Sequence, residues 1–181
     1  MVYILLGDGF EEIEALTQID YLRRAGIEII SVGIGKKEIC GGHNIKVIAD
    51  IEVQQAQNNF EMIILPGGLG GVKSILENDK AIQLIKSAYE QNKKIAAICA
   101  APSILASLGI LENKKAVCYP GFESCLCEGK ATPVMENSVV TDGNITTAKA
   151  AGASEEFSFE LIKILKGKEK ATEVKNSIFA R

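Results

Sequence analysis

The segment IAAICAAPSILASL, residues 95–108, places a cysteine between an apolar run and a helical pattern. Residues 95–98 are typical of a short strand that is buried on both faces of a sheet. The residues after Cys99 favour a helix over 100–108, and Pro102 stands near its start, where a missing N–H group does no harm. We therefore predict a sharp strand-to-helix turn at Cys99, comparable to the nucleophile elbow that holds the serine of many hydrolases.

Apolar runs and helical patterns alternate on both sides of this segment. Further strands are expected over residues 2–6, 27–34, 45–48, 62–65, 139–141 and 145–147. Further helices are expected over residues 11–25, 79–92 and 154–166, with a short helical stretch after Gly167 and a Gly-rich turn over 67–71. This order predicts an α/β fold in which helices cover both faces of a doubly wound, mostly parallel sheet, built as one domain over residues 1–181.

The first predicted helix carries an apolar stripe that we expect to face the core, made of Ile13, Leu16, Ile19 and Leu22. Glu14 lies beside that stripe and is expected to point into a cleft, although a solvated helix position is the alternative. Glu11 and Glu12 fit as first-turn charges that complement the helix dipole. The Gly-rich segment 40–44 is typical of a hairpin tip, which makes His43 a surface histidine.

Composition excludes several classes of protein. With 181 residues, 47% of them hydrophobic, the chain can build one substantial core but hardly two. The formal net charge of −3, with scattered Lys and Arg, offers no basic stripe for nucleic acid. No run of about 18 apolar residues predicts a membrane span. The five cysteines are odd in number and irregularly spaced, which favours reduced thiols in the cytoplasm over a disulfide framework or a zinc site.

Three features meet at the carboxyl ends of predicted strands, where open α/β sheets bind ligands. Glu14 follows the first strand, Gly67 and Gly68 follow the run 62–65, and Cys99 follows the next one. The helix after Cys99 should direct free N–H groups at the sulfur and lower the pKa of the thiol. The N–H groups of Gly68 and Ala100 are candidates for an oxyanion hole. A cysteine that merely ends a strand as a small buried hydrophobe is the open alternative.

Four motifs occur in an order that resembles a known family: residues 7–14 (GDGFEEIE), 65–68 (LPGG), 96–102 (AAICAAP) and 167–169 (GKE). Together they resemble the ThiJ/PfpI superfamily, in particular its DJ-one branch, over nearly the whole chain. The resemblance implies a flavodoxin-like sandwich, a homodimer, Cys99 as the nucleophile with Glu14 as its hydrogen-bonded partner, and Gly68 and Ala100 as oxyanion donors. Members of the superfamily are assigned glyoxalase or deglycase activity, redox sensing through a cysteine sulfinate, chaperone activity, or proteolysis.

One position departs from the pattern of the family. Many relatives have a histidine before the proline near the cysteine, whereas this chain has Tyr119 before Pro120. A Cys–His dyad, and with it a peptidase, is therefore disfavoured, because the leaving amine needs a proton donor. Tyr119, Gly67 and Cys118 are expected at the edge of the cleft, and Cys118 is a hypothetical resolving partner for oxidised Cys99. The pair Cys125 and Cys127 is interpreted as ordinary thiols.

These observations predict a cofactor-free enzyme that converts small reactive carbonyls of the methylglyoxal class and protects against carbonyl or oxidative stress. The alternative is a redox-sensing protective protein or chaperone that acts through a Cys99 sulfinate without turnover. An intracellular cysteine peptidase is the least favoured hypothesis. The expected partners are a small carbonyl substrate or an oxidant and a second copy of the chain, with no metal, nucleotide, nucleic acid or membrane.

Overall fold

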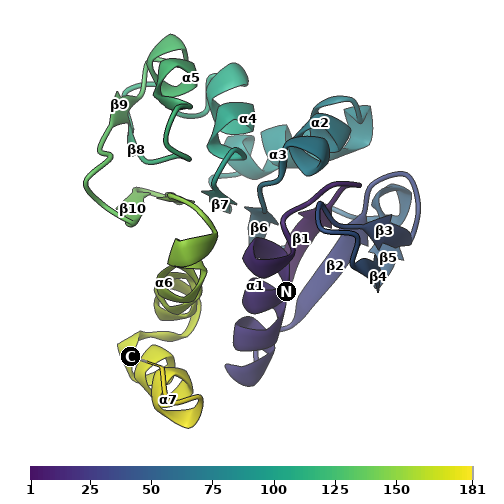
Figure 1. Ribbon diagram of the computed structural model, residues 1–181, viewed down its shortest axis with the longest axis vertical. Helices are drawn as coiled ribbons and strands as arrows, with labels where there is room; N and C mark the ends of the chain where they lie inside the picture. The colour runs from purple at the N-terminus through teal and green to yellow at the C-terminus, as the bar shows by residue number, and fades with distance from the viewer. Residues whose placement is uncertain (181) are drawn as a thin grey trace.

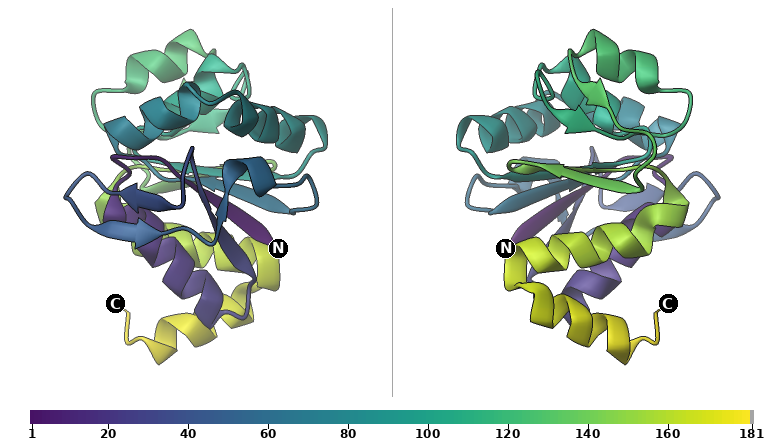
Figure 2. Two further views of the ribbon diagram at one scale, coloured as in Figure 1. Left: turned by 90° about the vertical axis from the view of Figure 1, so that its right-hand side faces the viewer. Right: turned by 90° about the vertical axis from the view of Figure 1, so that its left-hand side faces the viewer.

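The computed structural model describes residues 1–180 as a seven-stranded sheet between two layers of helices (Figures 1 and 2). The strand order is β10-β11-β7-β6-β1-β2-β5, and every neighbouring pair is parallel except β10 with β11. The fold is flavodoxin-like, which confirms the predicted fold class. The strands of the sheet are β1 (Val2–Leu6), β2 (Ile29–Gly33), β5 (Ile51–Glu52), β6 (Met62–Leu65), β7 (Lys94–Ile98), β10 (Val139–Asp142) and β11 (Ile145–Ala148).

The helices divide between the two faces of the sheet (Figure 2). One layer consists of α2 (Leu69–Leu76), α3 (Asp79–Glu90) and α4 (Pro102–Ser107), with α5 (Glu123–Glu128) packed on α4. The other layer consists of α1 (Glu12–Arg24), α6 (Ser154–Lys166) and α7 (Lys168–Ser177). None of the helices in the described part of the chain combines the length and the apolar character that crossing a bilayer requires.

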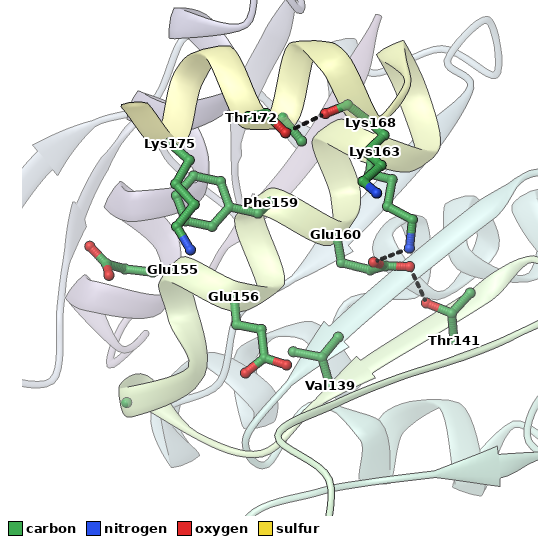
Figure 3. Close-up of a pocket in the computed structure, with 12 residues that line it drawn as sticks. Val139, Thr141, Glu155, Glu156, Phe159, Glu160, Lys163, Lys168, Thr172 and Lys175 are labelled. Carbon is green, nitrogen blue, oxygen red and sulfur yellow. Dashed lines mark hydrogen bonds and ion pairs between the residues drawn. The ribbon is translucent and has the colours of Figure 1, made fainter. Parts of the chain in front are cut away.

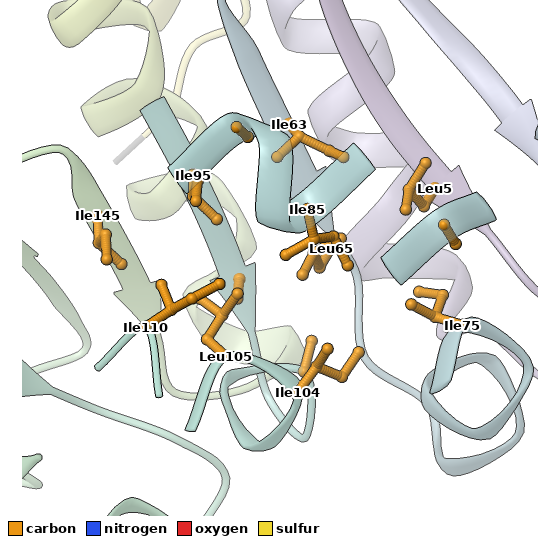
Figure 4. Close-up of a cluster of buried hydrophobic side chains, with 14 of the residues drawn as sticks. Leu5, Ile63, Leu65, Ile75, Ile85, Ile95, Ile104, Leu105, Ile110 and Ile145 are labelled. Atoms are coloured by element: carbon orange, nitrogen blue, oxygen red, sulfur yellow. The ribbon is translucent and has the colours of Figure 1, made fainter. Parts of the chain in front are cut away.

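Each face of the sheet has its own apolar core, because successive side chains of a strand point to opposite faces. In β1, Tyr3 and Leu5 belong to a cluster with apolar side chains of α2, α3 and α4, whereas Ile4 and Leu6 belong to a cluster with those of α1 and α6. Figure 4 shows the first of these clusters, in which Leu5, Ile63 and Leu65 lie beside apolar side chains from α2, α3 and α4. The central strands are therefore buried on both sides, and their carboxyl ends are held in rigid positions.

The remaining elements lie outside the main sheet. The hairpin of β3 (Glu38–Cys40) and β4 (Lys46–Ile48) is antiparallel, as predicted around residues 40–44. A small parallel pair joins β8 (Lys115–Ala116) and β9 (Thr132–Pro133). Two short 3-10 turns, η1 (Val53–Gln55) and η2 (Ala151–Ala153), complete the described chain.

The segment that was expected to be a Gly-rich turn is the helix α2. Its glycines allow the helix to lie directly on the loop after β1. A Cβ atom at Gly70 would lie 2.7 Å from the carbonyl oxygen of Asp8, and one at Gly71 would lie 2.9 Å from Cα of Phe10. The glycines therefore indicate close packing of two backbones, and their weak helix propensity is overridden by this tertiary contact.

The prediction for the buried face of α1 was wrong in part. Ile13 is 55% exposed and Leu16 is 36% exposed. The helix instead buries polar groups beside Ala15 and Leu22, and Gln18 illustrates how these groups are satisfied. The Gln18 amide donates to the carbonyl oxygen of Ser154 and accepts from the hydroxyl of Ser158, both on α6. Because buried polar groups need such partners, α1 packs on α6 through hydrogen bonds as well as apolar contacts.

Candidate active site

Cys99 forms the turn between β7 and α4 in a left-handed backbone conformation, with φ of 65°. This conformation costs a side-chain-bearing residue about 1–2 kcal/mol. Two backbone hydrogen bonds hold it: the N–H of Cys99 donates to Ala148 O at 2.9 Å, and Cys99 O accepts from the N–H of Tyr119 at 2.7 Å. The sharp turn predicted from the sequence is confirmed, and the cysteine side chain is half-buried.

Glu14 approaches the same turn from the first turn of α1 and is only 1% exposed. Its Oε2 accepts a hydrogen bond from the N–H of Gly67 at 2.8 Å, and the Cys99 thiol and the N–H of Ala151 are further partners. A Cβ atom at Gly67 would lie 2.5 Å from Glu14 Oε2 and 3.1 Å from Cys99 Sγ. Gly67 is therefore the place where the two side chains converge.

The two groups strongly affect each other's ionisation. Burial raises the pKa of Glu14 to about 7, although hydrogen bonds from Cys99 and Gly67 act in the opposite direction. Burial and the neighbouring Glu14 carboxylate raise the pKa of the Cys99 thiol to about 12. The predicted lowering of the thiol pKa is thus outweighed by desolvation. Because coupled groups titrate as a unit, the pair holds one proton and one negative charge between about pH 7 and pH 12.

Backbone N–H groups surround the sulfur. The N–H groups of Ala100 and Gly68 lie near the Cys99 sulfur, and both lower the pKa of the thiol and so favour its thiolate form. Gly68 has φ of 84°, and a Cβ atom there would collide with Gly9 O, so glycine is required at this position. Two donors directed at one atom are the arrangement that an oxyanion hole needs. The oxyanion role of these two groups stays a prediction.

A cavity of about 590 Å³ opens in front of Cys99. Aliphatic and aromatic side chains form much of its wall, and Tyr119 and Phe122 meet edge to face with ring centroids 6.3 Å apart. The cavity is lined by Glu11, Ile13, Glu14, His43, Gly68, Leu69, Cys99, Ala100, Tyr119, Phe122, Ala150, Ala151 and Gly152. The segment 150–152 was missed from the sequence, although its small residues follow a strand at the same edge of the sheet.

The structure separates the residues that were expected at the edge of the cleft. Tyr119 lines the cavity and is 46% exposed. Gly67 is buried behind the lining, in contact with Cys99. Cys118 is 1% exposed and packs in the core, and burial raises the pKa of its thiol to about 12. The interpretation of Cys118 as a cleft residue is therefore wrong, which removes the geometric basis for a resolving role.

Glu12 is a first-turn charge of α1, as predicted, but it is also only 4% exposed and holds the β3–β4 hairpin, which was not predicted. Its Oε1 accepts from the backbone N–H of His43 at 2.8 Å, and its Oε2 lies 2.9 Å from His43 Nδ1. Burial raises the pKa of Glu12, but the hydrogen bonds from His43 outweigh burial and lower the pKa overall. Glu12 also raises the pKa of His43, which is exposed as expected but stands at the rim of the cavity.

One group of side chains among residues 1–180 has the spacing of a possible metal site: Glu11, Glu12 and His43. Each of the three offers one potential ligand atom, and these atoms lie within 4.8 Å of one another. Their polar atoms already pair with each other, and the His43 side chain is 71% exposed. We assign no metal to them.

A second surface cavity, of about 770 Å³, lies between α6, α7 and β10 (Figure 3). Its described lining contains neither cysteine nor histidine, and Lys163 pairs with Glu160, which also accepts from Thr141. Both signs of charge occur around it, with three glutamates and three lysines. Because the cavity holds no thiol and no buried carboxyl–thiol pair comparable to Glu14 and Cys99, the candidate active site is the one at Cys99.

Comparison with known proteins agrees with this geometry. The DJ-1/PfpI family matches residues 1–164. Protein DJ-1 homolog B of Arabidopsis thaliana is 32% identical over 176 residues, which cover 96% of this chain and only 40% of the length of that protein. A protein named as a deglycase in Pyrococcus abyssi is 30% identical over 166 residues, which cover 91% of this chain and 99% of that protein.

The crystal structure of Drosophila melanogaster DJ-1beta is similar to the whole described fold. It has a TM-score of 0.95 at 32% identity and covers 99% of this chain and 97% of that one. The match extends over all three layers and includes the edge of the sheet where Cys99 and Glu14 meet. The chain belongs to the DJ-1/PfpI family.

Proposed function

We propose that this protein converts 2-oxoaldehydes such as methylglyoxal into 2-hydroxy acids, with Cys99 as nucleophile and Glu14 as proton carrier. The observation that carries the proposal is the buried contact of Glu14 with Cys99 beside two N–H donors, Gly68 and Ala100. The deglycase name of the Pyrococcus abyssi relative supports carbonyl chemistry for the family. No redox cofactor is needed, because the aldehyde carbon is oxidised while the neighbouring ketone carbon is reduced, and the addition of water involves no net oxidation.

The first step is addition of the sulfur to the aldehyde carbon. In the reactive form of the pair, the proton is on Glu14 and the negative charge is on Cys99. A carbon–sulfur bond forms, and the carbonyl electron pair moves to oxygen. The N–H groups of Gly68 and Ala100 stabilise that oxygen until Glu14 protonates it, which gives a hemithioacetal.

The second stage moves a proton between the two carbons. Glu14, now a carboxylate, removes the proton from the former aldehyde carbon, and the electron pair shifts to give an enediol. Reprotonation at the neighbouring carbon yields a 2-hydroxy thioester on Cys99. Water then attacks the thioester, the carbon–sulfur bond breaks, and the thiolate and a 2-hydroxy acid are released. Overall, one water is added to one 2-oxoaldehyde.

The test is the formation of lactate from methylglyoxal by fully reduced protein. The parent is expected to form lactate catalytically, and Cys99→Ser is expected to lose at least about a hundredfold in rate. Cys127→Ser is the matched control, because it removes an exposed thiol on α5. Parental activity in the Cys99→Ser protein would overturn the proposal.

A redox-responsive role is the second candidate, because the same donors would hold a sulfinate at Cys99. Each of two peroxide molecules would transfer one oxygen atom to the sulfur and leave as water. Mass spectrometry after mild peroxide treatment tests this role: selective gain of two oxygens at Cys99, without lactate formation, would favour it. Oxidation spread equally over Cys40, Cys125 and Cys127 would contradict it.

We also propose that the protein is a homodimer, as the family resemblance implies. The exposed apolar residues Ile13 and Leu16 on α1, together with Ile45 beside the hairpin, support this proposal. Ile45 lies next to α1, because its N–H donates to Glu12. Light scattering on the parent and Leu16→Glu proteins tests it: a dimeric parent and a monomeric variant are expected.

A further inference from the structure

We propose that the cavity at Cys99 selects neutral 2-oxoaldehydes that carry an aryl group on the ketone, with Tyr119 and Phe122 as the residues that determine this specificity. The inference rests on the proposed function and deepens it, because it names the substrate class. Tyr119 stands before Pro120, at the position that departs from the pattern of the family.

The backbone sets the position of the two rings relative to the nucleophile. The N–H of Tyr119 donates to Cys99 O at 2.7 Å, and the N–H of Phe122 donates to Tyr119 O at 3.0 Å. This turn brings both side chains to the cavity, where the rings meet at an interplanar angle of 83°. Aromatic rings favour such edge-to-face and offset arrangements, so an aryl substituent of the substrate has a preorganised wall to pack against.

A third large apolar side chain lines the cavity. Leu69, at the start of α2, belongs to the lining and is 69% exposed. A volume of about 590 Å³ lies within the range of roughly 300–1,000 Å³ typical of small-molecule sites. Methylglyoxal would leave most of this space filled with water. An aryl group would fill more of it and bury more of the apolar lining.

The charges of the cavity favour a neutral substrate. The charged side chains in its described lining are Glu11, Glu14 and His43, with no lysine or arginine. His43 is already paired with Glu12 and lies 3.5 Å from Glu11. A substrate carboxylate would therefore face acidic groups without a free cation to bind it. This arrangement disfavours oxoacids such as glyoxylate.

The kinetic test compares phenylglyoxal, methylglyoxal and 4-carboxyphenylglyoxal, a carboxylate-bearing 2-oxoaldehyde, with the reduced parent protein. We expect kcat/KM for phenylglyoxal to exceed that for methylglyoxal by roughly tenfold or more, and 4-carboxyphenylglyoxal to be a poorer substrate than phenylglyoxal. In Tyr119→Ala and Phe122→Ala, the phenylglyoxal-to-methylglyoxal ratio should fall about tenfold. Tyr89→Ala is the matched control, because Tyr89 is 43% exposed on α3 and lies outside the cavity; it should keep the parental ratio.

A binding test separates the aryl preference from turnover. The Cys99→Ser protein would be titrated by calorimetry with 2-hydroxyacetophenone and with hydroxyacetone, a pair of neutral ketones that differ in a phenyl and a methyl group. About tenfold tighter binding of the phenyl compound, lost in the Cys99→Ser/Phe122→Ala protein, is expected.

The outcomes separate the two claims. Turnover of methylglyoxal with no aryl preference in either test overturns the inference and leaves the proposed function intact. Absence of turnover with every substrate defeats the proposed function, and the binding test then decides the inference alone: a retained aryl preference supports it, and equal affinities overturn it. An unchanged substrate ratio in both aromatic variants also overturns it.

Discussion

The two sides of the first turn of α1 bury similar carboxylates in opposite states. Glu12 faces the β3–β4 hairpin and is 4% exposed, and Glu14 faces the turn at Cys99 and is 1% exposed. Burial raises the pKa of both, but His43 provides Glu12 with enough hydrogen bonds to lower its pKa overall, whereas the pKa of Glu14 rises to about 7. The partners of a buried carboxylate therefore decide whether it keeps its charge or its proton.

This difference separates a structural carboxylate, Glu12, from Glu14, the one that we propose as the proton carrier. Glu12 is ionised and ties a hairpin to a helix. Glu14 gains and loses a proton near neutral pH beside a thiol, which is what a general acid and base must do. Sequence position alone does not distinguish them, since they are two residues apart in the same segment.

The largest expected effect comes from exchanging each carboxylate for its amide. Glu14→Gln should lower the rate of lactate formation by about 10²–10⁴-fold, because the amide cannot carry the proton. Glu12→Gln keeps the shape at the hairpin side and should change the rate by less than about fivefold. The rates would be measured at matched protein concentrations, and circular dichroism would check that each variant is folded. Equal losses of rate in the two variants would contradict the distinction between Glu12 and Glu14.

The two carboxylates should also differ in the pH dependence of stability. Because the pKa of Glu14 is raised from 4.5 to about 7, its contribution to stability is present below about pH 4.5 and is lost as the pH rises through about 7. Glu14→Gln should therefore gain roughly 2–3 kcal/mol relative to the parent between pH 5 and pH 8, measured by urea unfolding.

Glu12 provides the control for this measurement. The pKa of Glu12 is lowered from 4.5 in the folded protein. The contribution of Glu12 to the free energy of unfolding is therefore present above about pH 4.5, and it is lost only when the pH falls through the lower pKa of the folded state. The stability difference between Glu12→Gln and the parent should change in this window only through His43, whose pKa Glu12 raises and whose stabilising pairing is lost as the pH rises through that raised pKa. The change between about pH 5 and pH 8 should therefore be smaller than for Glu14→Gln. A drift in that window as large as the one for Glu14→Gln would contradict the assignment.

A smaller effect is expected from the glycine that lies against each carboxylate. A Cβ atom at Gly67 would crowd Glu14 and Cys99, and a Cβ atom at Gly41 would crowd Glu12. Both Gly67→Ala and Gly41→Ala should lose about 1–3 kcal/mol of stability. Only Gly67→Ala should also lower the rate of lactate formation at least tenfold, because it moves Glu14 away from the sulfur. An equal rate loss in Gly41→Ala would remove the distinction.

The sequence predicted the parts of the fold that depend on local pattern. The strand Met62–Leu65 and the helix Ser154–Lys166 have the predicted bounds, and the turn at Cys99 follows from an apolar run that meets small residues and Pro102. Periodicity and turn chemistry specify these elements directly.

The errors arose where contacts with distant residues decide the outcome. Helix α2 was missed because Gly70 and Gly71 are poor helix formers. Glycine is needed at these positions because the helix contacts the loop after β1, and that contact cannot be predicted from the sequence. The burial of Glu12 was not predicted, because its partner, His43, lies 31 residues away in the sequence. The fall in the Cys99 pKa was expected from helix geometry alone, without the burial that outweighs it.

The most direct test of the central claim, that Glu14 and Cys99 share one proton near neutral pH, is the rate of Cys99 alkylation by iodoacetamide as a function of pH. Peptide mass spectrometry would follow Cys99 separately from the other four cysteines. We predict a rate that rises with a midpoint near pH 7, stays level above it and rises again toward pH 12, because loss of the first proton gives access to the thiolate and loss of the second leaves only thiolate. A rate with no step near pH 7 that rises only toward pH 12 would show that Glu14 and Cys99 do not share the proton, and would contradict the account.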